Sequence, residues 1–598
     1  MKPTRTPLAH ALSVLLALAL GACGGNKHEA SGAGAKKVFR FNRAEAFKTL
    51  DPMKQNDQAS IELVSNVYDS LLQYDYLARP YQLEPNLLTK MPALSADGLT
   101  YSFELRDDVR FNDDPCFTGG KGRKLTSDDV IYSFKRFADA NVNGVSYALL
   151  QGAIEGIDAF REQTKQLGKA ADYGKLAISG IVKQDARHFT IRLTRKNPLA
   201  LFPLAATPLS IVPYEAVEHY QERFQDHPVG SGPFVIKQMS RRGTIVLEKN
   251  PHYHQTYPAK GAPGDAQKGL LADAGKRLPL IDEVRLPLIE ETQPSMLKFL
   301  DGQLDWVAID RDNFVKMAFK DDSGFHLKPE YANKFAIYSE PSLSAAYFTF
   351  NMKDALLGKN PALRQAIAYA IDTPAFISRM RNGRGVPLKS IVPATISGGE
   401  NQVPAQWYPH DPELAKKKLA EAGYPGGKGL PPLIIDYGSS TTLSRQDFEF
   451  LRAELSEVGI TLKASFQTFS AFLQKVERGN FQMIDQAWGA DYPDAENFYA
   501  LLYSKNGPPG PNAAAYQNPE YDRLYEQIRD MPNGPERYAL FARMNEIIRT
   551  DVPVVLTWSP TLAGLYQRWV HNFKRNVMID LPLKYLDVDM AKRAKSGH

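Results

Sequence analysis

The sequence predicts an α/β or α+β fold of two or more domains, and three observations support this. A chain of 598 residues is longer than one ordinary hydrophobic core needs. Its composition, 43% hydrophobic and 23% charged, is typical of a globular protein. Segments with strand-like alternation of apolar and polar residues occur along the chain together with segments of helical spacing.

The first residues predict export from the cytoplasm. Lys2 and Arg5 precede an apolar run at 11–20 that is too short to cross a bilayer. The run ends in LGAC, which resembles a lipobox in which Cys23 is acylated. We therefore expect residues 1–22 to be a lipoprotein signal peptide; the alternative is an ordinary signal peptide with a chance cysteine. The mature chain would be lipid-anchored through Cys23 on the periplasmic or cell-surface side of the membrane.

Strand patterns begin after a Gly-rich and polar stretch at 23–35, which we expect to be a flexible tether. LTYSFELR alternates strictly and predicts a half-buried strand. Its apolar side consists of Leu99, Tyr101, Phe103 and Leu105. The same pattern recurs in TIRLTR at 190–195 and in TIVLEK at 244–249.

Helical spacing is clearest in three segments. The first places Ile61, Val64, Tyr68 and Leu71 on one face, and the last places Tyr521, Leu524, Tyr525 and Ile528 together. The middle one, DPELAKKKLAEAGYPGG, also has its ends marked. Asp411 suits the cap, Pro412 the first turn, and Gly423 followed by Pro425 the end of this helix.

Two Gly- and Lys-rich segments, 113–124 and 256–276, interrupt these patterns and are expected to be surface loops. The first contains Cys116. If Cys23 carries lipid, Cys116 has no partner among the 2 cysteines, and we expect no disulfide.

The common catalytic patterns are missing. There is no HExxH, no GxSxG and no cluster of His and Cys, and GGKGRKLTS lacks the spacing of a phosphate-binding loop. His252 and His254 form a pair without a third ligand, so we expect no metal site. Lys+Arg 72 nearly balance Asp+Glu 67, which does not favour nucleic acid as a partner. We therefore expect neither catalysis nor a cofactor.

WGADYPDAENF, residues 488–498, places three acids among three aromatic residues. Asp494 and Glu496 are well placed to cap a helix that begins at ENFYALLY, although ligand contact by Asp494 stays open. Trp488 suits either a ligand pocket or the core.

The chain resembles a known family. LDPMKQNDQASIELVSNVYDSLLQYD, residues 50–75, is similar to the opening of family 5 extracellular solute-binding proteins, the peptide- and nickel-binding components of ABC importers. Further similar motifs follow in the family's order between about residues 38 and 588. They are DGLTYSFELRDDVRF, LTSDDVIYSFKR, GSGPFVIKQ, IVLEKNPHY, YFTFN, LRQAIAYAID, AKKKLAEAGYP and WGADYPDAENF.

The resemblance implies an α/β fold of the periplasmic-binding-protein type, with two lobes, a hinge and a cleft. Lobe I would comprise residues 36–72, 210–340 and 565–598. An extra subdomain of lobe I would comprise 73–209, and lobe II 341–564.

The resemblance also implies a ligand site. Asp491 would bind the α-ammonium group of a peptide, which needs a carboxylate partner once it leaves water. Trp488 and Tyr492 would form apolar walls, and the backbone at Gly489 would approach the ligand closely.

On the first lobe, the loop after LDP would face the cleft and offer Asn56, Asp57 and Gln58; the alternative is a solvated loop. The oligopeptide-binding branch commonly has an Arg three residues before the Trp, and this sequence has Asp485 there. No Arg matches the one that holds a dipeptide's carboxylate, so ligand length stays open.

The function implied is that of a monomeric substrate-binding lipoprotein, which captures peptides and delivers them to the permease and ATPase subunits of an ABC importer. One rival keeps the fold but binds a nickel chelate, haem, opine or oligosaccharide. Others are a periplasmic hydrolase, for which no nucleophile and base are evident, and a sensor or chaperone on the same fold.

Overall fold

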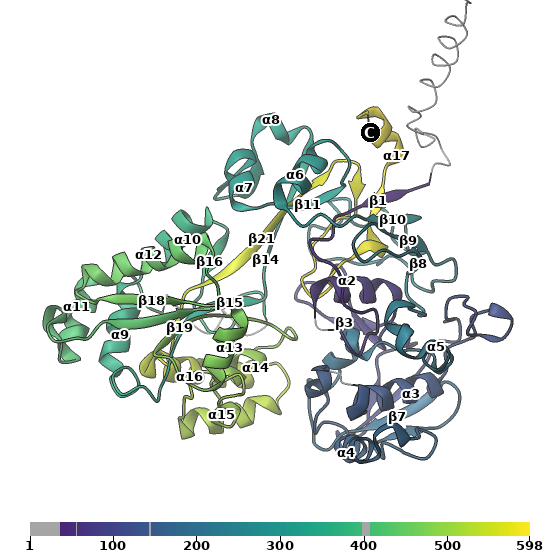
Figure 1. Cartoon of the computed structure of the whole chain (residues 1–598), viewed down its shortest axis with the longest axis horizontal. Coiled ribbons are helices and arrows are strands. Elements are labelled where there is room, and N and C mark those ends of the chain that lie inside the picture. Colours follow the sequence, from purple (N-terminus) through teal and green to yellow (C-terminus); the bar gives the residue numbers. More distant parts are fainter. Residues whose placement is uncertain (1–35, 56, 143–144, 397–406, 598) are drawn as a thin grey trace, which may run out of the picture.

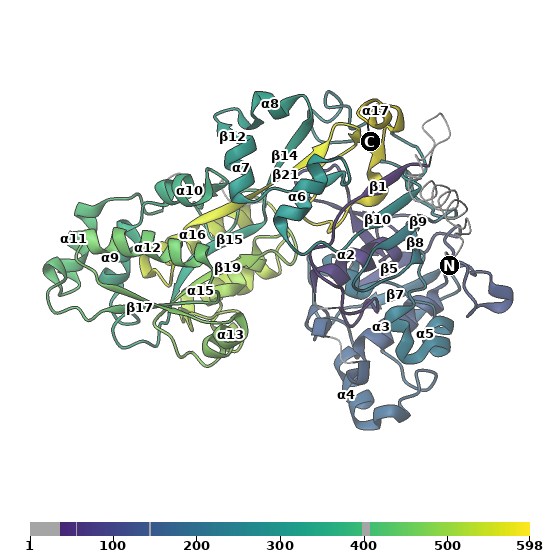
Figure 2. The same ribbon diagram turned by 45° about the horizontal axis from the view of Figure 1, so that its top comes forward.

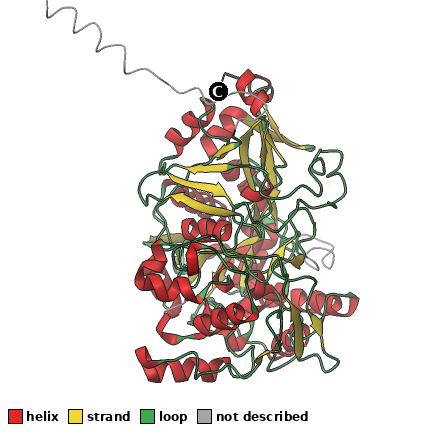
Figure 3. Cartoon of the chain, turned by 90° about the vertical axis from the view of Figure 1, so that its right-hand side faces the viewer, coloured by secondary structure: helices red, strands yellow, loops and turns green. Residues whose placement is uncertain are grey.

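The computed structural model describes residues 36–55, 57–142, 145–396 and 407–597. Figure 1 shows two bodies connected by long strands, and we name them the first and second lobes. The first lobe contains the beginning and the end of the described chain, and the second contains the five-stranded sheet. Both lobes contain helices and strands, so the fold is mixed α/β (Figure 3).

The first lobe is built on a four-stranded sheet of order β1-β10-β9-β8. β1 is parallel to β10, and the other neighbours are antiparallel. The strands are β1 (Val38–Arg40), β8 (Phe234–Gln238), β9 (Ile245–Lys249) and β10 (Glu283–Leu286). The last segment of the chain packs into the same core, through β22 (Val570–His571), β23 (Asp587–Val588) and α17 (Met590–Lys595).

A second part of the first lobe carries the antiparallel sheet β4-β5-β7-β6. Its core continues into α2, so this sheet is joined to the rest of the lobe by shared apolar packing. The strands are β4 (Ala93–Leu94), β5 (Thr100–Glu104), β6 (Ile181–Lys183) and β7 (His188–Arg192). The remaining elements are α2 (Gln58–Val67), β2 (Leu72–Tyr74), β3 (Leu83–Pro85), α3 (Ser127–Ala138), α4 (Ile157–Leu167) and α5 (Tyr214–Tyr220).

A third sheet lies beside both lobes, as Figure 2 shows, with order β11-β21-β14 and β16 paired to β21. It comprises β11 (Trp306–Ala308), β14 (Phe335–Pro341), β16 (Gly385–Pro387) and β21 (Trp558–Gln567). Around it lie α6 (Thr292–Leu300), α7 (Arg311–Met317), β12 (Ala318–Asp321), β13 (Gly324–Leu327) and α8 (Pro329–Ala332).

The second lobe is built on the sheet β18-β17-β19-β15-β20 with helices on both faces (Figure 1). Its strands are β15 (Ser344–Phe350), β17 (Leu433–Tyr437), β18 (Leu462–Phe466), β19 (Met483–Gly489) and β20 (Val554–Leu556). Its helices are α9 (Pro361–Ala370), α10 (Thr373–Arg381), α11 (Pro412–Glu421), α12 (Thr442–Glu457), α13 (Phe469–Glu477), α14 (Glu496–Tyr499), α15 (Pro519–Arg529) and α16 (Pro535–Asp551).

The chain passes between the lobes where two pairs of strands meet end to end. β14 leads into β15 through residues 342–343, and β20 leads into β21 through residue 557. Few residues therefore carry each crossing, as a hinge requires. The residue limits predicted for the lobes and the extra subdomain stay predictions.

Local sequence patterns predicted several elements correctly. The alternating segment forms β5, and Asp411 caps α11 by accepting a hydrogen bond from the backbone N–H of Leu414 at 2.9 Å. The apolar face expected for the last helix is buried along α15. The helix over residues 61–71 is shorter than predicted, since α2 ends at Val67, and Tyr68 has an extended backbone.

The segment 256–276 is only in part the surface loop that we expected. It contains neither helix nor strand, but Tyr257 and Leu270 are buried in a small aromatic cluster. Lys574 also reaches Asp265 at 2.7 Å, so the end of the chain fixes this loop to the first lobe.

Candidate functional site: a cavity between the lobes

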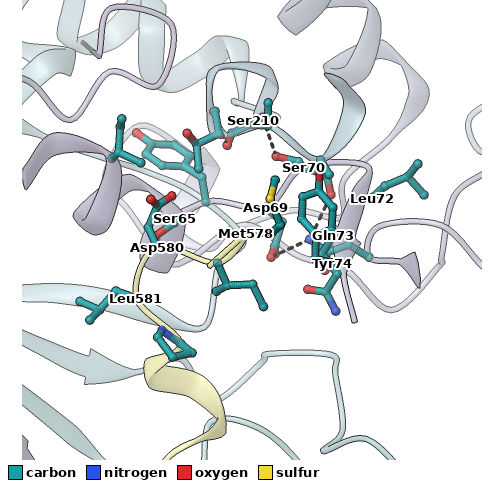
Figure 4. A pocket seen from close by; sticks show the side chains of 18 of the residues that line it. Ser65, Asp69, Ser70, Leu72, Gln73, Tyr74, Ser210, Met578, Asp580 and Leu581 are labelled. Atoms are coloured by element: carbon teal, nitrogen blue, oxygen red, sulfur yellow. Dashed lines mark hydrogen bonds between the residues drawn. The ribbon is translucent and has the colours of Figure 1, made fainter. Parts of the chain in front are cut away.

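A cavity of about 420 Å³ lies between the two lobes. Most of its wall comes from α2, β2 and the segment 577–585 of the first lobe, and the second lobe contributes Ala490 and Asp491. Figure 4 shows Ser65 of α2 close to Asp580 of the C-terminal segment. Segments far apart in the sequence thus form one wall.

A hydrogen-bonded network supports the first-lobe wall. The ammonium group of Lys584 donates to Gln73 Oε1 at 2.7 Å and to the hydroxyl of Tyr253 at 2.9 Å. Asp69 is buried in the same wall and accepts hydrogen bonds from Ser231 Oγ and Asn86 Nδ2. Burial lowers the pKa of Lys584 to about 8, against the opposing effect of Asp69 and Glu84. This wall therefore combines polar groups of both charges.

Gln58 belongs to an acidic corner of the same wall. Its side-chain amide donates to Asp580 Oδ1 at 3.2 Å and to Glu62 Oε1 at 3.4 Å. Burial raises the pKa of Glu62 to about 7, and it also raises the pKa of Asp580. Gln58 thus reaches the cavity through Asp580, while Asp57 caps α2 by accepting from the backbone N–H of Ser60.

Asp491 presents an exposed carboxylate at the second-lobe side of the cavity. The buried side chain of Asn497 holds it in place, because Asn497 Nδ2 donates to Asp491 Oδ2 at 2.8 Å. The carbonyl oxygen of the same amide accepts from the Asp491 backbone N–H at 3.1 Å and from the Trp488 indole at 2.9 Å. Trp488 is half-buried against the core of the second lobe, and neither Trp488 nor Gly489 lines the cavity.

Tyr492 connects the lobes through an aromatic stack. Its ring lies 5.7 Å from that of Phe202, which lines the cavity from the first lobe, and Phe202 stacks on Tyr74. The Tyr492 hydroxyl donates to Glu496 at 2.5 Å, and Tyr525 donates to the other oxygen of that carboxylate. Tyr492 therefore contacts a lining residue without lining the cavity itself.

Asp494 has a structural role. Arg537 of α16 binds both of its oxygens at 2.8 Å, and both side chains are almost fully buried. Asp494 also accepts from the backbone N–H of Glu496, the first residue of α14, but the N-cap position of this helix is occupied by Ala495 and not by Asp494 as expected. Glu496 binds tyrosine hydroxyls and does not cap the helix through its side chain.

One edge of β19 is open next to Asp491. β15 pairs with β19 over its whole length, from Phe350 with Met483 to Ser344 with Gly489. On the other side, β17 pairs only with Met483 and Ile484. Within the described part of the chain, the edge from Asp485 to Gly489 therefore has no strand partner, and it leads toward Asp491. A Cβ at Gly489 would meet only Ser344 Oγ, at 3.5 Å, so this end is not crowded.

The placement of the other predicted residues is mixed. Asn56 and Cys23 lie outside the described residues. His254 is directed to the backbone oxygen of Asn86 at 3.0 Å, and the described residues contain no group of three side chains able to hold a metal ion. Cys116 is half-buried, and burial raises the pKa of its thiol.

Several lining residues were not predicted. They include Ser65, Asp69, Gln73, Tyr74, Phe202, Asp580 and Lys584. Ser65, Asp69, Gln73 and Tyr74 lie within the family motif at residues 50–75. Nothing in the sequence connects Asp580 and Lys584 with α2. Across the described residues, no helix is long and apolar enough to span a membrane.

Comparisons with known proteins support the resemblance. The chain is 22% identical over 558 residues to the oligopeptide-binding protein OppA of Bacillus subtilis, covering 91% of this chain and 92% of that protein. It is 25% identical over 506 residues to heme-binding protein A of Haemophilus influenzae, covering 83% and 81%.

Solved structures show the same fold. HbpA2 from Haemophilus parasuis is similar with a TM-score of 0.72 and 20% identity, covering 93% of this chain and 100% of that one. DppA from Helicobacter pylori, in complex with the peptide STSA, is similar with a TM-score of 0.68 and 23% identity, covering 92% and 98%. The sequence model of the family described as "Bacterial extracellular solute-binding proteins, family 5 Middle" matches residues 82–510. This match covers more than half of the chain. The chain therefore belongs to the family 5 bacterial extracellular solute-binding proteins, which bind solutes and are not enzymes.

Proposed function

We propose that this protein is the substrate-binding component of an ABC importer, which captures peptides between its lobes and delivers them to permease and ATPase subunits. The observation that carries the proposal is the open edge of β19 next to the exposed carboxylate of Asp491. An extended peptide can pair with such an edge through its main chain, and this pairing is independent of its side chains.

Asp491 suits the amino end of such a peptide. An ammonium group that enters a cavity loses water and needs a charged partner. Asn497 fixes the Asp491 carboxylate through one oxygen, and the other oxygen has no partner among the described residues. The relatives named oligopeptide-binding protein and the complex of a similar fold with a peptide support this assignment.

The remaining features of the proposal come from the sequence. Lipid on Cys23 would anchor a monomer on the periplasmic or cell-surface side of the membrane. Closure about the two crossings between the lobes would bury the ligand and present both lobes to the permease.

The first test is native mass spectrometry of the protein purified from its host, followed by denaturing release of its ligand. A ladder of short peptides supports peptide import. A single non-peptide species, such as haem, would overturn the peptide assignment; one relative of this chain is named for binding haem.

The second test addresses Asp491. Asp491→Asn is expected to weaken binding of a peptide with a free amino terminus by about 2 kcal/mol or more, because the buried ammonium loses its charged partner. Isothermal titration with a free peptide and its N-acetylated form measures this effect. Asp107→Asn, an exposed aspartate of the first lobe, is the matched control. Equal affinity of the wild type for both peptides would show that Asp491 does not bind the amino terminus.

A further inference from the structure

A second cavity, of about 220 Å³, lies at the other end of the open β19 edge. Helices α10 and α12 and strands β15, β17 and β19 enclose it, and Trp558 at the start of β21 completes the wall. Asp485 and Ala487 of β19 line it, whereas Asp491 beyond the far end of the strand lines the cavity between the lobes. The open edge thus runs from one cavity to the other.

The charges of this cavity do not balance. Its lining contains one basic side chain, Arg381, and two carboxyl groups, those of Asp447 and Asp485. Arg381 donates to both oxygens of Asp447, at 2.8 and 2.6 Å, and this pair neutralises itself. The carboxyl group of Asp485 has no hydrogen bond or ion pair with any described residue, so one acidic group faces the cavity without a partner.

Arg381 already has a carboxylate partner in Asp447. Its guanidinium lies over the ring of Phe376 at 4.6 Å and over that of Trp558 at 5.0 Å, while Asp447 takes two of its donors. A ligand carboxylate in this cavity would also face Asp485. The arrangement therefore disfavours a carboxylate and favours a cation.

The walls suit the stem of a long cationic side chain. Phe376 packs edge-to-face with Phe450 at 5.5 Å and with Trp558 at 6.2 Å, and all three rings line the cavity. Aromatic faces attract ammonium and guanidinium groups and also cover the methylene carbons of lysine or arginine.

The environment of Asp485 favours binding of a positively charged partner. Its side chain is exposed to the cavity, while the surrounding protein desolvates it. This desolvation, together with Asp447 and against the effect of Arg381, raises the pKa of Asp485 to about 7. A ligand cation would restore the ordinary preference for the charged form.

We infer that the cavity beside Asp485 binds a second positive group of the ligand, a lysine- or arginine-like side chain, and that Asp485 selects it. The inference rests on the proposed peptide function and names its substrate class, which is cationic peptides. Asp485 and Asp491 are six positions apart, or at most about 20 Å along an extended chain. A peptide whose amino terminus reaches Asp491 can therefore place a side chain a few residues later beside Asp485.

The test uses tri- to pentapeptides of alanine in which one residue, from the second to the fifth, is either lysine or norleucine. Norleucine keeps the apolar stem and removes the charge. Wild-type protein is expected to bind the lysine peptide at least ten-fold more tightly at one position, and Asp485→Asn to abolish that preference. Asp491→Asn is expected to weaken both peptides and to keep the preference.

The outcomes separate the two proposals. If no peptide binds, the peptide function itself is wrong. If alanine peptides bind but lysine and norleucine are equivalent at every position in the wild type, only the role of Asp485 is overturned, and this comparison needs no variant. A strong loss on amidation of the peptide carboxyl group, with no lysine preference, would instead assign the second cavity to a carboxylate and refute the inference. Circular dichroism of Asp485→Asn checks that the variant is folded.

Discussion

Asp485 shows how one residue can oppose the stability of the fold that contains it. A carboxylate whose pKa is about 7 in the folded protein holds its proton after the unfolded chain has lost it at its ordinary pKa of about 4. Between these values the folded state binds more protons, so stability falls as pH rises from about 4 to about 7 and the loss persists above. Asp447, Arg381 and Tyr437 are the titratable groups around Asp485.

Asp485→Asn should therefore stabilise the ligand-free protein more at pH 8 than at pH 4.5. Calorimetric melting of the wild type and the variant at both pH values measures this stabilisation. The titrations of all other groups cancel when the variant is compared with the wild type at the same pH. Asp107→Asn, whose side chain is exposed on the first lobe, is the control and should show no such pH dependence. A difference in melting temperature that is the same at both pH values would show that the Asp485 carboxylate is not destabilised by the fold.

At the scale of elements, the ion pair of Asp494 and Arg537 joins the segment after β19 to α16. The same segment carries Asp491 and Tyr492, so this pair positions the second-lobe side of the cavity. Because both partners are buried, removal of either leaves an uncompensated polar group.

Asp494→Asn is expected to lower the free energy of unfolding by about 3 kcal/mol or more, since the Arg537 charge loses its partner. Urea unfolding followed by fluorescence measures the change. Asp530→Asn removes half of an exposed ion pair with Arg195 and should cost less than about 1 kcal/mol. Comparable losses in the two variants would contradict the buried role of Asp494.

The elements that the sequence predicted well are those specified locally. Asp411, Pro412 and the apolar stripe of α15 act within a few residues of one another, and so their effects are visible in the sequence. Alternation along β19 does not show which face meets a cavity, because that depends on the helices α10 and α12, which come from distant parts of the chain. The orientation of Asp485 therefore required the structure.

For the whole molecule, the aromatic stack of Tyr74, Phe202 and Tyr492 is a direct contact between the lobes. Aromatic pairs contribute about 0.5–1.5 kcal/mol beyond the area that they bury. A contribution of this size shifts a two-state equilibrium by about two- to ten-fold. The stack can therefore change how far the lobes separate in the absence of ligand.

Phe202→Ala is expected to increase the radius of gyration of the ligand-free protein, because the lobes lose this contact, while saturating ligand should restore the wild-type value. Small-angle X-ray scattering measures both states. Phe319→Ala, an exposed phenylalanine of β12 outside the cavity, is the matched control. An unchanged radius in a folded Phe202→Ala protein would show that the stack does not hold the lobes together.

The residues that line the main cavity come together only in the folded molecule, which is why several of them were not predicted from the sequence. Lys584 and Asp580 line the same cavity as α2 only because the C-terminal segment returns to the first lobe. Their roles depend on contacts across several hundred residues, for which a single sequence carries no periodic or local signal. The motif WGADYPDAENF pointed to Asp491 because it is one short continuous segment.

The open edge of β19 also bears on how the protein avoids self-association. An unpaired strand edge is a template on which copies of a protein can join into larger aggregates. Here the two ends of the edge face spaces of about 220 and 420 Å³, which are too small for a folded domain. A narrow extended chain fits where another copy of the molecule does not, so the protein can keep its edge available to ligands while excluding other copies of itself.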